Sequence, residues 1–210
     1  MNGNASRKLH ALSLAGGLLA WSAGPGRRYP VMQALLATAL VTITKAPLGF
    51  RPPAVWAGLR VGSIAASVVA LAVAAGTAIP RVRASMADRD PAPSPAIWLA
   101  VRIPAGTVWS EEAAYRGALG TLAAAGFGVR GGRLVQAITF GLSHIPDARA
   151  TGEPVVGTVV ATGVAGWVFG WLAQRSGSLV APVLAHLAIN EAGAVAALRV
   201  QSRKGGNDEH

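Results

Sequence analysis

Three short motifs in the second half of the chain combine residue types that can hydrolyse an amide bond. A carboxylate can act as a general base, an imidazole can move a proton, and a side-chain amide can donate a hydrogen bond to an oxyanion. Each motif places such groups among apolar neighbours. In chain order they are Glu111-Glu112-x-x-x-Arg116, Phe140-x-x-x-His144 and His186-x-x-x-Asn190. Together they predict a hydrolytic site.

The two adjacent glutamates have different predicted roles. On an α-helix, Glu112 and Arg116 are four residues apart and share a face, so we expect an ion pair between them. Glu111 is rotated by about 100° from Glu112, which aims its carboxylate elsewhere. Because a charged group inside a membrane helix costs about 2.5–3.5 kcal/mol, such groups point to function. We therefore predict that Glu112 supports Arg116 and that Glu111 is the catalytic carboxylate. The alternative is an ordinary surface pair at a helix end.

The two internal histidines each share a helix face with a second motif residue. His144 lies four residues after Phe140, and His186 lies four residues before Asn190. A lone histidine is usually structural, but two hydrogen-bonding side chains on one face of an apolar helix predict a polar cavity. Two carboxylates lie beside the motifs rather than on their faces and rank as secondary: Asp147 and Glu191.

Two hydrolytic mechanisms fit these residues. In the first, Glu111 and one histidine activate water, while the other histidine and Asn190 stabilise the oxyanion. In the second, Glu111, His144 and His186 bind zinc, which supplies the nucleophile. The chain has no cysteine and no HExxH segment, which excludes a cysteine nucleophile and a conventional zinc-protease helix. The first mechanism is favoured, without a cofactor, and zinc is the alternative.

The elements that position these motifs are predicted to be membrane helices. Hydrophobic residues make up 52% of the 210 residues and charged residues only 13%. A membrane-spanning helix needs about 20 mainly apolar residues, and the recurrence of apolar runs predicts an all-α, polytopic membrane bundle of about six to eight transmembrane helices. The runs are 9–23, 31–50, 55–79, 96–110, 134–146, 155–173 and 178–198. The first could instead be the core of a signal peptide, but no clear cleavage site follows it, which favours a membrane helix.

Charge and composition divide the chain and indicate its surroundings. The net charge of +10 arises from arginines between the apolar runs, where basic residues meet lipid headgroups, so membrane lipid rather than nucleic acid is the expected partner. The charged and proline-rich stretch 81–96 is expected to be an exposed loop. It separates N-terminal membrane helices (1–95) from a catalytic membrane domain (96–200), and a polar, disordered tail (201–210) follows. Gly58–Gly62 and Gly166–Gly170 have a spacing that permits close helix contact.

The three motifs, in this order, resemble the CAAX protease and bacteriocin-processing family of intramembrane proteases, which includes the type II CAAX prenyl endopeptidases. The resemblance covers residues 105–195 and includes EEAAYRGAL at 111–119 and RSGSLVAPVLAHLAIN at 175–190. It implies a peptidase whose site lies within the bilayer and whose substrate is a membrane-associated or lipidated peptide. It also implies that Glu111 and His144 activate water, that His186 and Asn190 form the oxyanion hole, and that Glu112 and Arg116 support them.

Two other classes of function stay open. The first is a non-enzymatic immunity or scaffold protein of the same fold, against which the intact motifs argue. The second is a small proton-coupled transporter that uses Glu111 and the histidines as a relay, although no inverted repeat is present. The abundance of Ala, Gly and Arg suggests a GC-rich prokaryote, and therefore a prokaryotic cell membrane. In such an organism a short membrane peptide is a more suitable substrate than a prenylated protein.

Overall fold

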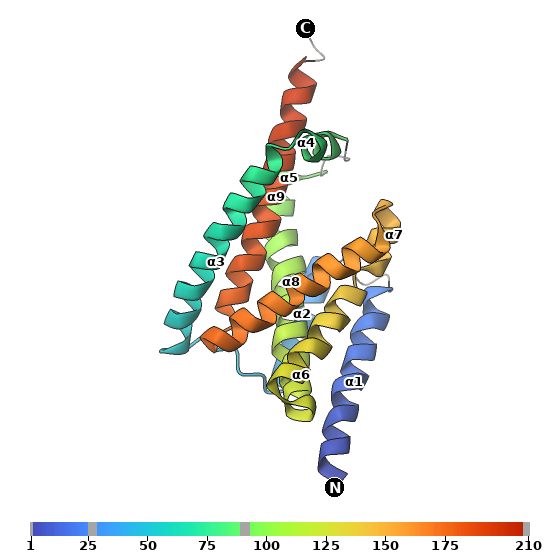
Figure 1. Cartoon of the computed structure of the whole chain (residues 1–210), viewed down its shortest axis with the longest axis vertical. Coiled ribbons are helices and arrows are strands. Elements are labelled where there is room, and N and C mark those ends of the chain that lie inside the picture. The colour runs from blue at the N-terminus through green and yellow to red at the C-terminus, as the bar shows by residue number, and fades with distance from the viewer. Residues whose placement is uncertain (1, 25–28, 89–92, 208–210) are drawn as a thin grey trace.

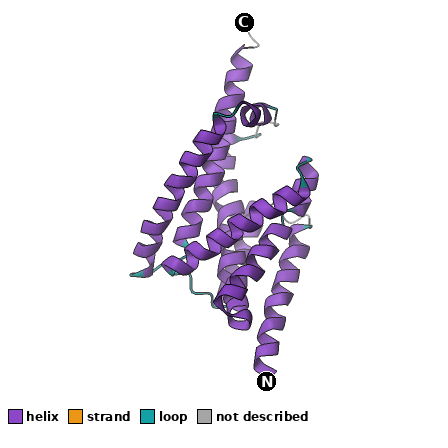
Figure 2. Cartoon of the chain, in the orientation of Figure 1, coloured by secondary structure: helices purple, strands orange, loops and turns teal. Residues whose placement is uncertain are grey.

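The computed structural model describes residues 2–24, 29–88 and 93–207, and every regular element among them is a helix (Figure 2). This confirms the all-α class. In chain order the elements are α1 (Asn2–Ser22), α2 (Pro30–Ile43), α3 (Ala54–Thr77), α4 (Pro80–Ala87), α5 (Pro95–Ile97), the π-helices η2 (Trp98–Trp109) and η3 (Glu112–Leu119), α6 (Gly120–Leu142), α7 (Ile145–Thr151), α8 (Val155–Ser176) and α9 (Val180–Asn207).

Among the described residues, three helices are long and apolar enough to cross a membrane: Ala54–Thr77, Val155–Ser176 and Val180–Arg203. Large apolar side chains on these helices face outward, with Leu71 72% and Val156 77% exposed. Such exposure suits contact with lipid chains. Three candidate spans among the described residues are fewer than the predicted six to eight, because the other apolar runs lie in helices that are short, interrupted or, as in α1, partly polar. For example, α2 has 14 residues, and η2 contains a proline.

Glycines set the closest contacts between the long helices. Helices α3 and α9 run side by side in the same direction (Figure 1). A Cβ atom at Gly58 would lie 2.8 Å from the side chain of Ser178, two residues before α9, and one at Gly62 would lie 2.8 Å from Ala181 of α9. Gly166 and Gly170 of α8 face the side chains of α6 in the same way. Because glycine has no side chain, backbones can approach closely at these positions. The contacts predicted for both glycine pairs are confirmed.

Helix α6 is divided by a sharp bend at Gly128, where φ is 74° and ψ is 169°. Glycine adopts this conformation readily, whereas residues with a side chain rarely do. A Cβ atom at Gly132 would meet the backbone of Ala123 and Ala124, so the second arm of α6 doubles back against the first. The predicted apolar run 134–146 is too short to span a bilayer because most of it is the second arm of this bent helix.

Two segments predicted to lack regular structure contain helix. In the stretch 81–96, residues Pro80–Ala87 form α4, whose side chains are largely exposed, while residues 89–92 lie outside the described residues. Helix α9 continues through the predicted disordered tail to Asn207, and residues 208–210 again lie outside the described part. The polar composition of both segments correctly indicated exposure to solvent. Exposure does not exclude a helix, because a helix satisfies its own backbone hydrogen bonds. Proline at the first helical position also favours the start of α4.

The principal core surrounds η3. Helices α1 and α2 pack against η3, and α1 also packs against its continuation, α6. Small side chains from α1 and α2, such as Ala15 and Ala37, contact buried Ala118 and Leu119 of η3. A Cβ atom at Gly117 would lie 2.7 Å from the side chain of Val41 in α2. This close packing fixes the position of the segment that carries the glutamate motif.

Candidate active site

The glutamate motif lies where η2 meets η3. Every residue of η3 is buried. A π-helix closes its turns with i→i+5 hydrogen bonds, so it is wound more widely than an α-helix and is often found at functional sites. The angle between neighbouring side chains is therefore smaller than the roughly 100° of an α-helix. Glu111 lies just before η3 and has α-helical backbone angles (φ −76°, ψ −44°).

Glu112 holds two groups at once. Its Oε1 atom lies 3.4 Å from Nη1 of Arg116, and the side chains of both residues are completely buried. The same oxygen accepts a hydrogen bond of 2.7 Å from Nδ1 of His186. Since a carboxylate only accepts, Nδ1 carries the proton. The predicted Glu112–Arg116 pair is therefore present, and Glu112 in addition fixes the orientation of His186.

Glu111 faces the other ring nitrogen of the same histidine. Its Oε2 atom lies 3.8 Å from Nε2 of His186. The two glutamates therefore face different atoms, because Glu112 contacts Arg116 and Nδ1 of His186 whereas Glu111 faces Nε2. At 3.8 Å the two atoms are too far apart for a direct hydrogen bond, yet one water or substrate oxygen could contact both. The side chain of Glu111 is 19% exposed, so of the two carboxylates only Glu111 is accessible.

Two phenylalanines enclose the charged groups. Phe169 of α8 stacks on His186 with ring centroids 5.0 Å apart and an interplanar angle of 27°. Cζ of Arg116 lies 4.0 Å from the ring centroid of Phe140 and 5.1 Å from that of Phe169. Cation–π contacts of this kind are strongest where water is excluded. Phe169 belongs to none of the three motifs, and nothing in its apolar helix distinguishes it from the aromatic residues that face outward.

His144 lies at the end of the second arm of α6, against Phe140. The two ring centroids are 4.7 Å apart, and Nδ1 of His144 lies 2.8 Å from the carbonyl oxygen of Phe140. Since a carbonyl only accepts, Nδ1 carries the proton, which leaves Nε2 of a neutral ring as an acceptor. Phe140 also contacts His186 edge-on at 6.3 Å. It therefore lies between the two histidines of the predicted site.

An apolar cavity leads to Glu111. It has a volume of about 350 Å³ and lies between α1, α2 and the junction of η2 with η3. Ser143, the neighbour of His144, lines the same cavity as Glu111. Most of the remaining lining is apolar and comes from α1 and α2, including Leu14, Gly17, Leu18, Leu36 and Leu40.

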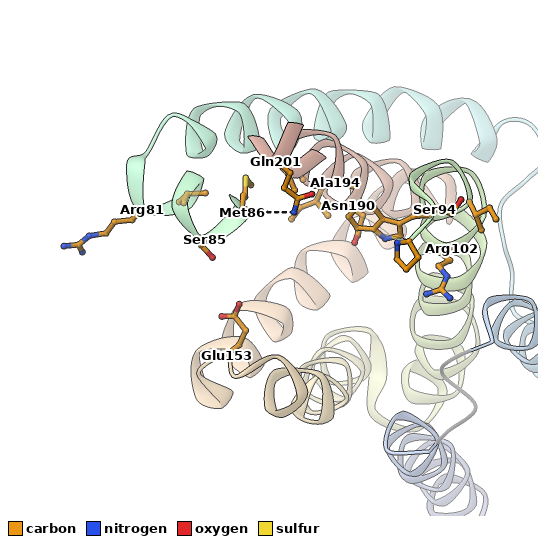
Figure 3. A pocket seen from close by; sticks show the side chains of 16 residues that line it. Arg81, Ser85, Met86, Ser94, Arg102, Glu153, Asn190, Ala194 and Gln201 are labelled. Carbon is orange, nitrogen blue, oxygen red and sulfur yellow. Dashed lines mark hydrogen bonds between the residues drawn. The ribbon is translucent and has the colours of Figure 1, made fainter. Parts of the chain in front are cut away.

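Asn190 lines a different and larger cavity. This cavity, of about 1070 Å³, lies among α4, η2 and α9, and its lining includes Arg81, Arg102 and Glu153 (Figure 3). Nδ2 of Asn190 donates a hydrogen bond of 3.1 Å to the backbone carbonyl of His186. The amide group has a second N–H, which this bond does not use. The structure thus groups six of the seven predicted residues around Phe140 and His186, whereas Asn190 lines the larger cavity.

The zinc alternative requires Glu111, His144 and His186 to converge on one point. Zinc sites in proteins are built from three or four His, Cys, Asp or Glu ligands around one point. Within residues 2–24, 29–88 and 93–207, no group of three or more such side chains could hold a metal ion. The hydrogen bond from Nδ1 of His186 to Glu112 does not weigh against zinc, because metal-binding histidines commonly donate their second ring N–H to a carboxylate.

Comparison with known proteins agrees with the site. Residues 93–192 match the family described as type II CAAX prenyl endopeptidase Rce1-like. The match covers 100 of the 210 residues. The Rce1-like segment contains all three motifs, from Glu111 to Asn190, which confirms the resemblance and supports a protease of the membrane. No match was found among curated proteins or among solved structures.

Proposed function

We propose that the protein is an intramembrane endopeptidase in which Glu111 activates the attacking water. The observation that carries this proposal is the placement of two carboxylates on one imidazole. Glu112 is buried and orients His186 through Nδ1, whereas Glu111 is accessible and faces Nε2. Glu112 thus supports the histidine and Glu111 is accessible to react, although the two residues are adjacent in the sequence. The match to the Rce1-like family supports the same reaction class.

In the proposed reaction, Glu111 takes a proton from water, and the water oxygen attacks the carbonyl carbon of the peptide bond. With protons on both ring nitrogens, His186 donates one hydrogen bond to Glu112 and the other to the developing oxyanion. The unused N–H of Asn190 is the proposed second donor. The captured proton then passes to the amine nitrogen as the C–N bond breaks, with the acceptor nitrogen of His144 assisting the transfer.

The two cavities suggest how a substrate is held. A peptide bound across His186 would place one side in the apolar cavity beside Glu111 and the other in the larger cavity beside Asn190. The apolar lining fits hydrophobic side chains or a lipid group. We therefore propose a membrane-associated peptide as substrate, in the cell membrane of a prokaryote.

The experiment is cleavage of a synthetic lipid-anchored peptide by the purified protein in proteoliposomes, followed by mass spectrometry. An endopeptidase yields two fragments whose summed mass is that of the substrate plus one water. A Glu111→Gln preparation made in parallel controls for contaminating proteases. A scaffold protein would give no fragments, and a transporter would give proton flux without fragments. Either result would overturn the proposal.

A further inference from the structure

A third cavity, of about 500 Å³, is lined by two arginines and by no acidic residue. It lies among η3, α6, α8 and the start of α9, and shares no lining residue with the two cavities already described. The arginines are Arg116 and Arg133. Polar side chains complete part of the wall: Thr121, Gln136, Gln174 and Ser178.

Both arginines have buried nitrogen atoms that make no hydrogen bond to the described residues. Nε, Nη1 and Nη2 of Arg116 make no hydrogen bond within the described part of the chain, although its side chain is completely buried. Its ion pair with Glu112 is long, and the Glu112 oxygen in that pair also accepts from His186. Nε of Arg133 is likewise buried without an acceptor, and its guanidinium lies 4.3 Å from the Trp167 ring centroid. Oε2 of Glu112 is also buried without a hydrogen bond, so an acceptor for Arg116 is present beside it. The cavity lining offers Nε of Arg133 no carboxylate, and buried donors are almost always paired, so this atom indicates a missing acceptor.

The chemistry of the missing acceptor follows from the donors. Guanidinium groups bind phosphate and carboxylate oxygens through parallel hydrogen bonds, and basic pockets between membrane helices bind lipid headgroups. We propose that this cavity binds a phosphate-class oxyanion between Arg116 and Arg133, supplied by an anionic phospholipid headgroup or by free phosphate. Neither residue has this role in the reaction proposed above.

Such a ligand would be connected to the reaction through Arg116. Glu112 shares one oxygen between Arg116 and Nδ1 of His186. An oxyanion on Arg116 would compete with Glu112 for the guanidinium and thereby alter how firmly Glu112 holds His186. An effect on the cleavage rate rests on the proposed function. Binding itself does not, so failure of one can be distinguished from failure of the other.

The test is native mass spectrometry of the full chain in detergent after incubation with phosphatidylglycerol, phosphatidylcholine or inorganic phosphate. We expect retention of phosphatidylglycerol or of phosphate, and about a tenfold weaker retention in Arg133→Gln, because a hydrogen bond to a charged group is lost. Arg130→Gln is the matched control, because Arg130 is exposed on the same helix and does not line the cavity. Arg133→Lys is a second variant that keeps the positive charge but lacks the planar guanidinium group, and it should weaken retention by a smaller factor than Arg133→Gln does. Thermal unfolding verifies that each variant is folded.

Each outcome decides the proposal. Retention of phosphatidylglycerol that phosphate does not displace identifies a lipid headgroup, and displacement by phosphate identifies a site for a free oxyanion. The proposal is overturned if the wild type retains phosphatidylcholine as well as phosphatidylglycerol and binds no phosphate. It is also overturned if Arg130→Gln and Arg133→Gln weaken retention equally.

Discussion

Replacing Glu112 by glutamine removes the only carboxylate that lies within ion-pair distance of Arg116 in the described residues. Both side chains are completely buried, so water cannot compensate the guanidinium without opening the core. Removal of one partner of a buried pair costs about 3–5 kcal/mol. Glutamine retains an oxygen that can accept from Nδ1 of His186, so most of this loss comes from Arg116. For a chain of this size, about 2–4 °C per kcal/mol gives a fall in Tm of about 6–20 °C.

The assay is thermal unfolding in detergent, followed by tryptophan fluorescence, of the wild type and three variants. Glu111→Gln changes a partly exposed group and should shift Tm by no more than about 2 °C. The double variant Glu112→Gln/Arg116→Met removes both charges and should recover most of the lost stability. A Glu112→Gln variant as stable as the wild type would refute the reasoning. So would a double variant that is no more stable than Glu112→Gln.

Three further predictions concern substrate, oxyanion and metal. Gly17 lines the apolar cavity, and a Cβ atom there meets no atom within 4 Å, so Gly17→Phe should fill the cavity and lower kcat/KM. Gly16→Phe is the control, because Gly16 is equally open but does not line the cavity, and it should keep the wild-type kcat/KM. Equal loss in both variants would argue against a substrate cavity. Asn190→Ala should reduce kcat by about 10²–10³ with little change in KM, and a variant that binds poorly but turns over normally would show that Asn190 positions substrate instead. Elemental analysis should find less than stoichiometric zinc, with activity retained after a strong chelator; activity lost on chelation and restored by zinc would reverse this expectation.

The parts of the site that depend on local spacing could be predicted from the sequence. Glu112 and Arg116 pair because they are four residues apart on one helix, and this contact depends little on the rest of the fold. The apolar runs likewise predicted membrane helices, because the hydropathy of a helix reflects whether lipid or water surrounds it and not which other helices pack against it.

The parts that depend on long-range packing could not be predicted. The hydrogen bond from His186 to Glu112 joins residues 74 apart in sequence, and it depends on how α9 packs against η3. The approach of Glu111 to Nε2 of the same imidazole likewise depends on where α9 places His186. Phe169 has no signature of its own in the sequence, and only its packing on His186 reveals it. The direction of Asn190 also follows from the placement of α9 between two cavities.

The central claim is that Glu111 is the reactive carboxylate, and the most direct measurement is the single-turnover rate of peptide cleavage in proteoliposomes. Glu111→Gln should lower this rate by about 10²–10⁴, the usual contribution of general-base catalysis, with the fold intact. Glu191→Gln is the matched control, because Glu191 lines neither cavity of the site, and it should keep the wild-type rate. Cleavage by folded Glu111→Gln at the wild-type rate would contradict the assignment, as would an equal loss of rate in both variants.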